Sequence, residues 1–334
     1  MTTAARISYA FMLLMLLAVL VFNMGHVVLA ALFSFMFMEM FFRAVRLRVT
    51  GAAAARWIAA VAFVITATLL LMIFLRFIKQ TLRTLPDIVE VALPQVMALA
   101  QKYGLDLPFA NFQDLREFAN DKILVNAMSI TKASTLLTKE VFHMVIGVVA
   151  SVLFFLGGKT PKYEPNLFDA VRKETNLRIR KFVYSFEKVF GAQIAISGIN
   201  TVLTGLFLHF IAMPHFAFLT TMTFIIGILP IIGNIITNTV IVVTALGISF
   251  NQALMALAFL IFIHKFEYFL NSKIMGSSVN LPMWQILIAV LIGNTIMGVP
   301  GIMLAPAILH YIKSELQSIP WTQPRIIANH TTAV

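Results

Sequence analysis

Eight apolar stretches run along the chain, and short polar or charged segments separate them. An α-helix needs about 20 apolar residues to cross the hydrocarbon core of a bilayer. Inside that core a helix pairs its own backbone polar groups, which a lone strand cannot do. The pattern therefore predicts an all-α, polytopic membrane protein with about eight transmembrane helices. The stretches cover residues 9–22, 27–42, 57–77, 141–156, 192–212, 216–246, 253–270 and 284–312.

The last third of the chain departs from this simple pattern, because Gly, Pro and Asn recur inside its apolar stretches. Residues 227–234 read Gly-Ile-Leu-Pro-Ile-Ile-Gly-Asn, and Gly298, Pro300 and Gly301 interrupt the final stretch. Pro removes a backbone donor, and Gly allows backbone angles that other residues avoid. Irregular backbone at membrane depth persists only inside the protein or beside a water-filled cavity. We therefore expect broken or re-entrant helices and a transport region in residues 191–312.

One of the charged segments has the pattern of an amphipathic helix. Residues 159–188 carry eight basic side chains against four acidic ones. Next to this charge an apolar stripe recurs at helical spacing. A basic helix with an apolar stripe lies on a membrane surface, so we expect this helix at the cytoplasmic face. The stripe consists of Phe182, Phe186, Val189 and Phe190.

Residues 79–140 differ from this basic segment, because their acidic and basic side chains balance and three prolines punctuate them. This composition is typical of a helical segment outside the bilayer. The predicted organisation is 1–78 for the N-terminal transmembrane helices, 79–140 for an extracytoplasmic helical segment, 141–190 for the fourth span and the amphipathic helix, 191–312 for the transport region and 313–334 for a cytoplasmic tail.

Composition supports the membrane prediction and orients it. The chain is 60% hydrophobic and only 12% charged, whereas soluble domains carry about 25% charged residues. Excess Lys and Arg mark cytoplasmic loops, and Arg6, residues 43–56, residues 159–188 and Lys313 fall on one side if the spans alternate. We therefore expect a protein of the inner or plasma membrane with both termini in the cytoplasm.

The net charge of +11 raises the question of nucleic-acid binding. The basic residues flank apolar stretches, however, and no nucleic-acid-binding motif is found, so we expect the bilayer as the partner. The chain has no Cys, which excludes disulfides and Cys-ligated metals. The histidines near span ends, His26, His143, His209 and His215, lack zinc-ligand spacing. No metal or cofactor is expected.

Three sequence elements resemble the autoinducer-2 exporter (AI-2E) family, also called PerM-like permeases. They are Leu-Pro-Ile-Ile-Gly-Asn at 229–234, Ile-Met-Gly at 274–276 with Val-Asn-Leu-Pro at 279–282, and the spacing of Gly293, Gly298, Gly301 and Ala305-Pro306. The chain departs from the family at Ile231, where Tyr is usual, at Asn234, where a second Pro is usual, and at 271–273, which lack a Pro. The resemblance implies a polytopic transporter that exports small signals or exchanges cations and that associates as a homo-oligomer.

The two broken stretches supply candidate binding residues. Ile-Gly-Asn occurs at 232–234 and again at 292–294, and paired interruptions in corresponding segments point to a transporter site. Half-helix ends present amide dipoles and free carbonyls, and Asn amides both donate and accept hydrogen bonds. The alternative is that these residues only allow close helix packing or bending. The candidates are Pro230, Gly233, Asn234, Gly293, Asn294, Gly298 and Gly301.

Glu267 completes the candidate set, since an ionisable group within a span is costly and suggests function. It shares a helical face with His264 and, through the family resemblance, matches a recurrent acidic position. The alternative is an interfacial cluster in which Lys265 pairs with Glu267. The other carboxylate in a span, Glu39, is expected to pair with Arg43 one turn away.

Three functions remain open at this point. A secondary transporter that exports a small polar metabolite or signal, such as autoinducer-2, leads. Sodium/proton antiport is the second, and it requires a titratable carboxylate at depth, for which only Glu267 and Glu39 qualify. A membrane scaffold that transports nothing is the third. The chain has no P-loop, no Gly-x-Ser-x-Gly and no His-Glu-x-x-His, so we expect neither ATP hydrolysis nor another enzymatic activity.

Overall fold

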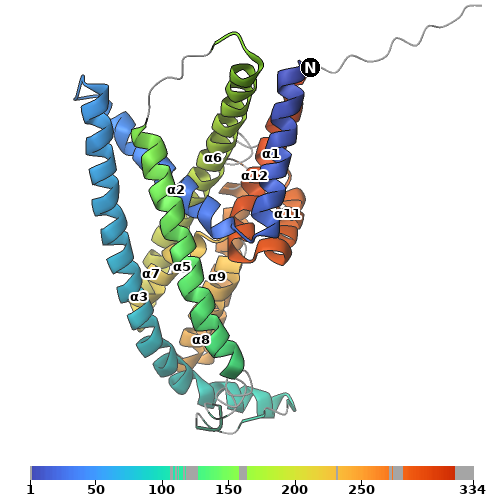
Figure 1. Ribbon diagram of the computed structural model, residues 1–334. Helices are drawn as coiled ribbons and strands as arrows, with labels where there is room; N and C mark the ends of the chain where they lie inside the picture. The colour runs from blue at the N-terminus through green and yellow to red at the C-terminus, as the bar shows by residue number, and fades with distance from the viewer. Residues whose placement is uncertain are drawn as a thin grey trace, which may run out of the picture.

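The computed structural model describes residues 2–105, 108–109, 111, 113–115, 117, 127–157, 164–230, 232–270, 273 and 281–319. These residues are mostly α-helical and include no strand, which confirms the all-α prediction. Ile231 and most of the 274–282 element lie outside them. The helices are α1 (Thr3–Val21), α2 (Gly25–Arg46), α3 (Ala52–Lys102), α5 (Ala127–Leu156), α6 (Leu167–Phe210), α7 (Phe216–Gly227), α8 (Ile232–Ile248), α9 (Phe250–Leu270), α11 (Met283–Met297) and α12 (Val299–Gln317) (Figure 1).

The long helices have the dimensions of membrane spans. α1, α2, α3, the 139–156 part of α5, and α6 are each long and apolar enough to cross a bilayer. Many large apolar side chains of α1, α3 and α5 face outward, for example Leu14 at 65% and Phe154 at 67% exposure. Such exposure is costly in water but suits lipid. The chain is therefore a multi-pass membrane protein.

The sixth apolar stretch is a helical hairpin. α7 ends at Gly227, the chain turns through Pro230, and α8 begins at Ile232. Phe218 near the start of α7 packs in one cluster with Ile241 in the second half of α8, so the two helices are antiparallel. The predicted break is present, and the chain folds back there instead of continuing as a kinked span.

The eighth apolar stretch is a second hairpin, made by α11 and α12. Gly298 between them has φ +61°, which is favourable only for Gly. The backbones of Gly293 and Gly301 are in direct contact, so that a Cβ on either would overlap the carbonyl group of the other. Small residues allow this close approach between helices.

The turns of the hairpins meet inside the protein. A Cβ placed on Gly25, just after the turn from α1 to α2, would touch Met297 and Pro300 at the α11–α12 turn. Ile228 and Ile232, on either side of the α7–α8 turn, pack against the apolar cluster that contains Met297. The irregular backbone therefore packs against other parts of the protein and is partly covered by them, which suits backbone that leaves the helical pattern at membrane depth.

The predicted position of the apolar stripe of residues 182–190 on the membrane surface is wrong. Phe186, Val189 and Phe190 are buried, at 0%, 3% and 2% exposure, and Phe182 packs against the same central cluster. This stripe therefore faces α2 and the C-terminal hairpin instead of lipid. Sequence periodicity identified an apolar face, but it cannot distinguish a face covered by protein from one covered by a bilayer.

The basic segments gather at one end of the molecule. Figure 1 places the N-terminus, the α2–α3 turn and the start of α6 at this end, and the end of α3 at the other. Here Arg43 of α2 contacts Glu187 of α6 at 3.3 Å and also forms the expected pair with Glu39. That this end faces the cytoplasm stays a prediction, as does the division of the chain into five segments.

Replacing Gly301 by Ala should destabilise the protein, because the added methyl group overlaps the Gly293 carbonyl. Overpacking of this kind costs about 1–3 kcal/mol, so the thermal unfolding midpoint of the purified protein in detergent should fall by several degrees. Gly191→Ala is the matched control, since its Cβ would meet no atom within 4 Å. An unchanged midpoint for Gly301→Ala would contradict the close contact between α11 and α12.

Candidate functional site

The α7–α8 turn is held by side chains of α6. Pro230 has no backbone donor, and the turn leaves carbonyl groups of α7 without helical partners. Gln193 Nε2 donates to the Gly227 carbonyl at 3.2 Å, and Ser197 Oγ donates to the Phe224 carbonyl at 3.0 Å. Two side chains of one helix therefore satisfy the end of another, and they fix where the turn lies.

These two residues belong to a buried polar stripe on α6. Gln193, Ser197, Asn200 and Thr204 recur at intervals of four, three and four, which places them on one helical face. Their exposures are 6%, 2%, 6% and 2%. None of the sequence predictions included this stripe, although polar residues at helical period inside the apolar 192–212 stretch were a usable signal.

Asn234 and Glu267 meet beside this stripe. Asn234 Nδ2 donates to Glu267 Oε2 at 2.6 Å, which links α8 to α9. The Asn200 side chain of α6 also lies close to Glu267, and its Oδ1 is buried without a hydrogen-bond partner among the described residues. Three helices thus contribute polar groups to one point, and an acceptor there remains available to a donor.

Glu267 is a buried carboxylate with neutral hydrogen-bond partners. It is 9% exposed, and no Lys or Arg of the described residues lies within 4.0 Å of it. Lys265, the predicted alternative partner, is exposed on the same helix. A buried carboxylate without a cationic partner is expensive, so this one requires a reason beyond packing.

A groove lies between α8 and α9, and it is lined by residues one helical turn from Asn234 and Glu267 along the chain. Its volume is about 460 Å³, and Asn238 and His264 line it together with Thr239, Lys265 and apolar residues of both helices. Asn238 lies one turn from Asn234, and His264 lies one turn from Glu267. The polar cluster therefore has a neighbouring groove large enough for a small molecule.

The sequence-predicted residues fall into two groups. Pro230, Gly233, Asn234 and Glu267 come together at the α7–α8 turn, where Thr237 Oγ1 donates to the Gly233 carbonyl at 3.0 Å. The second group, Gly293, Asn294, Gly298 and Gly301, shapes the α11–α12 hairpin. Asn294 is exposed on α11, and no hydrogen bond among the described residues joins it to Asn234.

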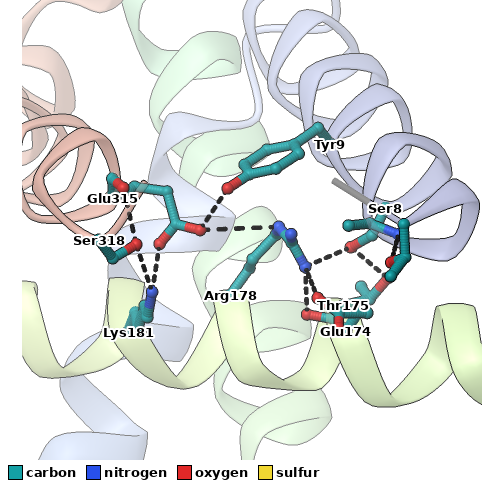
Figure 2. A network of polar contacts seen from close by, with 10 residues as sticks. Ser8, Tyr9, Glu174, Thr175, Arg178, Lys181, Glu315 and Ser318 are labelled. Atoms are coloured by element: carbon teal, nitrogen blue, oxygen red, sulfur yellow. Dashed lines mark hydrogen bonds and ion pairs between the residues drawn. The ribbon is translucent and has the colours of Figure 1, made fainter. Parts of the chain in front are cut away.

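A second polar network lies at the opposite end of the C-terminal hairpin. Arg178 of α6, at 5% exposure, donates to Glu174 Oε2 at 2.7 Å and to Ser8 Oγ of α1 at 3.3 Å. Its guanidinium also stacks on the Tyr9 ring, 3.9 Å from the centroid. Figure 2 shows these groups between α1, α6 and α12.

Glu315 of α12 completes this network. Tyr9 Oη donates to Glu315 Oε1 at 2.7 Å, and Lys181 Nζ donates to Oε2 at 2.8 Å. Glu315 lies beyond the last apolar stretch, which ends at residue 312. Burial alone would raise the pKa of this carboxyl, but the hydrogen bonds from Lys181 and Tyr9 outweigh burial and hold its pKa below the usual value. The network anchors the end of α12 to α6.

A histidine pair lies near the α1–α2 turn. Glu140 Oε2 is 2.5 Å from His26 Nδ1 and 3.8 Å from His143 Nδ1. Within the described ranges, no group of three or more His, Cys, Asp or Glu is arranged to hold a metal ion. These side chains join α2 to α5.

Comparison with known proteins gives two findings. The family model described as "AI-2E family transporter" matches residues 7–321. The protein named "Putative transport protein YdbI" of Bacillus subtilis (strain 168) is 27% identical over 181 residues, which cover 51% of this chain and 51% of YdbI. The chain thus matches about half the length of this relative.

Glu267→Leu should destabilise the protein, because it leaves the half-buried amide of Asn234 without its acceptor. Unpaired buried polar groups cost about 1–3 kcal/mol each. Glu267→Gln keeps an acceptor oxygen of the same size, so its thermal unfolding midpoint in detergent should stay near that of the parent chain. Equal midpoints for the Leu and Gln variants would argue against this hydrogen bond.

Stability should depend on pH through Glu315. Its folded pKa is lowered from 4.5, so it stabilises the fold above that value, and this contribution is lost as the pH falls through the folded pKa. Glu315→Gln should therefore unfold at a lower temperature than the parent chain at about pH 7 and lose less stability on acidification to about pH 3.5. Glu90→Gln, an exposed carboxylate, serves as the control. Parallel pH profiles for parent and Glu315→Gln would refute this role.

Proposed function

This chain belongs to the AI-2E transporter family, and from that premise we propose that it is a secondary transporter whose cargo binds at the α7–α8 turn. Asn200, Asn234 and Glu267 are the proposed binding groups. The observation that carries this proposal is the buried Glu267 carboxylate, which has neutral amide partners and a groove one helical turn away. Ionisable groups held inside membrane segments mark substrate and ion pathways.

The chemistry of these groups favours a small polar solute. A carboxylate and an amide carbonyl accept hydrogen bonds, and amide N–H groups donate them, so a polyhydroxylated metabolite finds partners for both kinds of bond. The Asn200 Oδ1 atom supplies a buried acceptor for a hydroxyl. Export of a signal such as autoinducer-2 is the proposed activity, and the protein is proposed to act as a homo-oligomer in the cell membrane with both termini cytoplasmic.

Sodium/proton antiport is a second candidate, and one observation favours it. Glu39 is paired with Arg43 at the surface, whereas Glu267 is buried without a cationic partner in the described part of the chain. A carboxylate in such a position can bind either a proton or a cation, and each of them neutralises its charge. Binding of one therefore displaces the other, as antiport requires. A scaffold role gives no reason for keeping this charge buried.

Transport would involve rearrangement of the hairpins. The α7–α8 hairpin is tied to α6 by two side-chain-to-carbonyl hydrogen bonds, and the α11–α12 hairpin is tied to α6 by the Glu315 network. Secondary transporters expose a central site alternately by moving one bundle against another. We propose that α6 is the fixed element and that the hairpin turns move beside it.

Glu267→Gln should reduce transport at least tenfold in proteoliposomes, because a buried hydrogen bond to a charged group is worth about 1.5–3 kcal/mol. Efflux of autoinducer-2 and sodium-driven change of an internal pH dye are measured in parallel for the parent chain, Glu267→Gln and Glu39→Gln. Loss of solute efflux alone supports export, and loss of the pH response alone supports antiport.

Glu39→Gln is the matched control, since it removes a carboxylate from an exposed ion pair and should retain at least half of the parent activity. Full activity of Glu267→Gln in both assays would show that Glu267 does not bind the cargo. A parent chain inactive in both assays would favour the scaffold function.

A further inference from the structure

The first half of α6 has two opposite faces. Its buried face holds Thr175, Arg178, Phe186 and Val189, at 9%, 5%, 0% and 3% exposure. This face packs against α1 and α12 through the polar network of Arg178 and Glu315 and against the central apolar cluster. One side of the helix is therefore fully occupied by the protein itself.

The other face carries a regular stripe. Lys173, Leu177, Arg180 and Tyr184 follow at intervals of four, three and four residues, so they share one line along the helix. At about 100° per residue this line lies about half a turn from the buried face. Leu177 and Tyr184 are 49% and 54% exposed, and Lys173 and Arg180 are also exposed.

The acidic residues of this part of α6 do not neutralise the stripe. Asp169 accepts hydrogen bonds at the start of α6, from the Glu164 backbone and the Asn166 side chain. Glu174 is paired with the buried Arg178, and Glu187 with Arg43. In the described part of the chain no carboxylate lies within 4.0 Å of Lys173 or Arg180. The exposed stripe therefore keeps its positive charge.

We propose that this stripe, defined as Lys173, Leu177, Arg180 and Tyr184, binds the headgroups of acidic phospholipids. The two cations contact lipid phosphate, and the two apolar side chains lie among the upper parts of the acyl chains. Basic side chains close to an anionic membrane surface are attracted to it, and apolar side chains beside them can enter the boundary between headgroups and acyl chains. The proposal concerns the lipid around the protein and does not depend on what is transported.

The position of the stripe favours a membrane over a soluble acidic partner. α6 continues without a break into the apolar residues 192–210, so the stripe precedes a membrane span on the same helix. Tyr184 lies about 12 Å before residue 192 along the helix axis, and Lys188 Nζ sits 5.1 Å from its ring centroid. Tyr and Lys are enriched at this boundary, where long side chains reach the headgroup layer.

Lipid contact can be measured because the chain contains no Cys. A single Cys at Leu177 is labelled with an environment-sensitive fluorophore, and the full chain is reconstituted into vesicles containing either brominated phosphatidylglycerol or brominated phosphatidylcholine at equal mole fraction. Quenching by the acidic lipid should exceed quenching by the zwitterionic lipid several-fold. High salt should reduce this ratio toward one, because it screens exposed charges.

Removing the two charges tests the assignment directly. In the background of the labelled chain, Lys173→Gln with Arg180→Gln should bring the quenching ratio close to one, since each basic residue near an anionic surface contributes about a fivefold gain in binding. The matched control is Lys79→Gln with Arg83→Gln, two exposed basic residues on α3, which should leave the ratio unchanged.

Two results would overturn the proposal. A quenching ratio near one in the parent chain, or a high ratio that survives removal of both charges, shows that the stripe does not select acidic lipid. A fluorophore that stays exposed to water in both kinds of vesicle places the stripe outside the bilayer surface and leaves a soluble acidic partner as the occupant. The emission maximum of the dye separates these cases, and folding of each variant is checked by its unfolding midpoint.

Discussion

The need to pair every backbone polar group away from water governs this structure. A turn inside an apolar stretch exposes carbonyl groups that no helix can satisfy. Here Gln193 and Ser197 of α6 donate to the carbonyls of Gly227 and Phe224, so the α7–α8 turn becomes permissible. The same stripe of α6 places Asn200 beside Glu267. The residues that stabilise the turn and the α6 residue of the candidate site therefore lie on one face of α6.

The α11–α12 hairpin is stabilised by close backbone packing instead of by side-chain hydrogen bonds to its turn. Gly298 makes the turn with a positive φ, and the backbones of Gly293 and Gly301 approach too closely for any side chain. The far end of α12 is then held by Glu315, which accepts hydrogen bonds from Tyr9 and Lys181. One hairpin is attached to α6 at its turn and the other at its end, so α6 contacts both and is suited to be the element around which they move.

Family membership indicates the general function of the chain, and the geometry of the site indicates what it could bind. The family match identifies a transporter, while the cargo depends on particular side chains. The buried amide of Asn200 and the half-buried amide of Asn234 lie beside a carboxylate, and we propose that they offer donors and acceptors to a hydroxylated solute while the carboxylate offers a negative charge to a cation. The proposed lipid contact of the outward stripe on the first half of α6 is separate from the cargo. In this proposal the charged residues of α6 have two roles, because those on the inner face anchor α12 and those on the outer face bind lipid headgroups.

The sequence by itself determined the all-α membrane class, the breaks near Pro230 and Gly298, and the presence of Asn234 and Glu267 as polar groups in apolar surroundings. These follow from local chemistry, because lipid solubility, helix interruption and the cost of a buried charge are properties of short segments. Only the tertiary structure decided that the broken stretches fold back as hairpins, that Asn234 pairs with Glu267 while Asn294 faces outward, and that the Phe186 stripe is covered by protein. Those outcomes depend on which distant segments supply a hydrogen-bond donor or an apolar surface, and no pattern within a single segment contains that information.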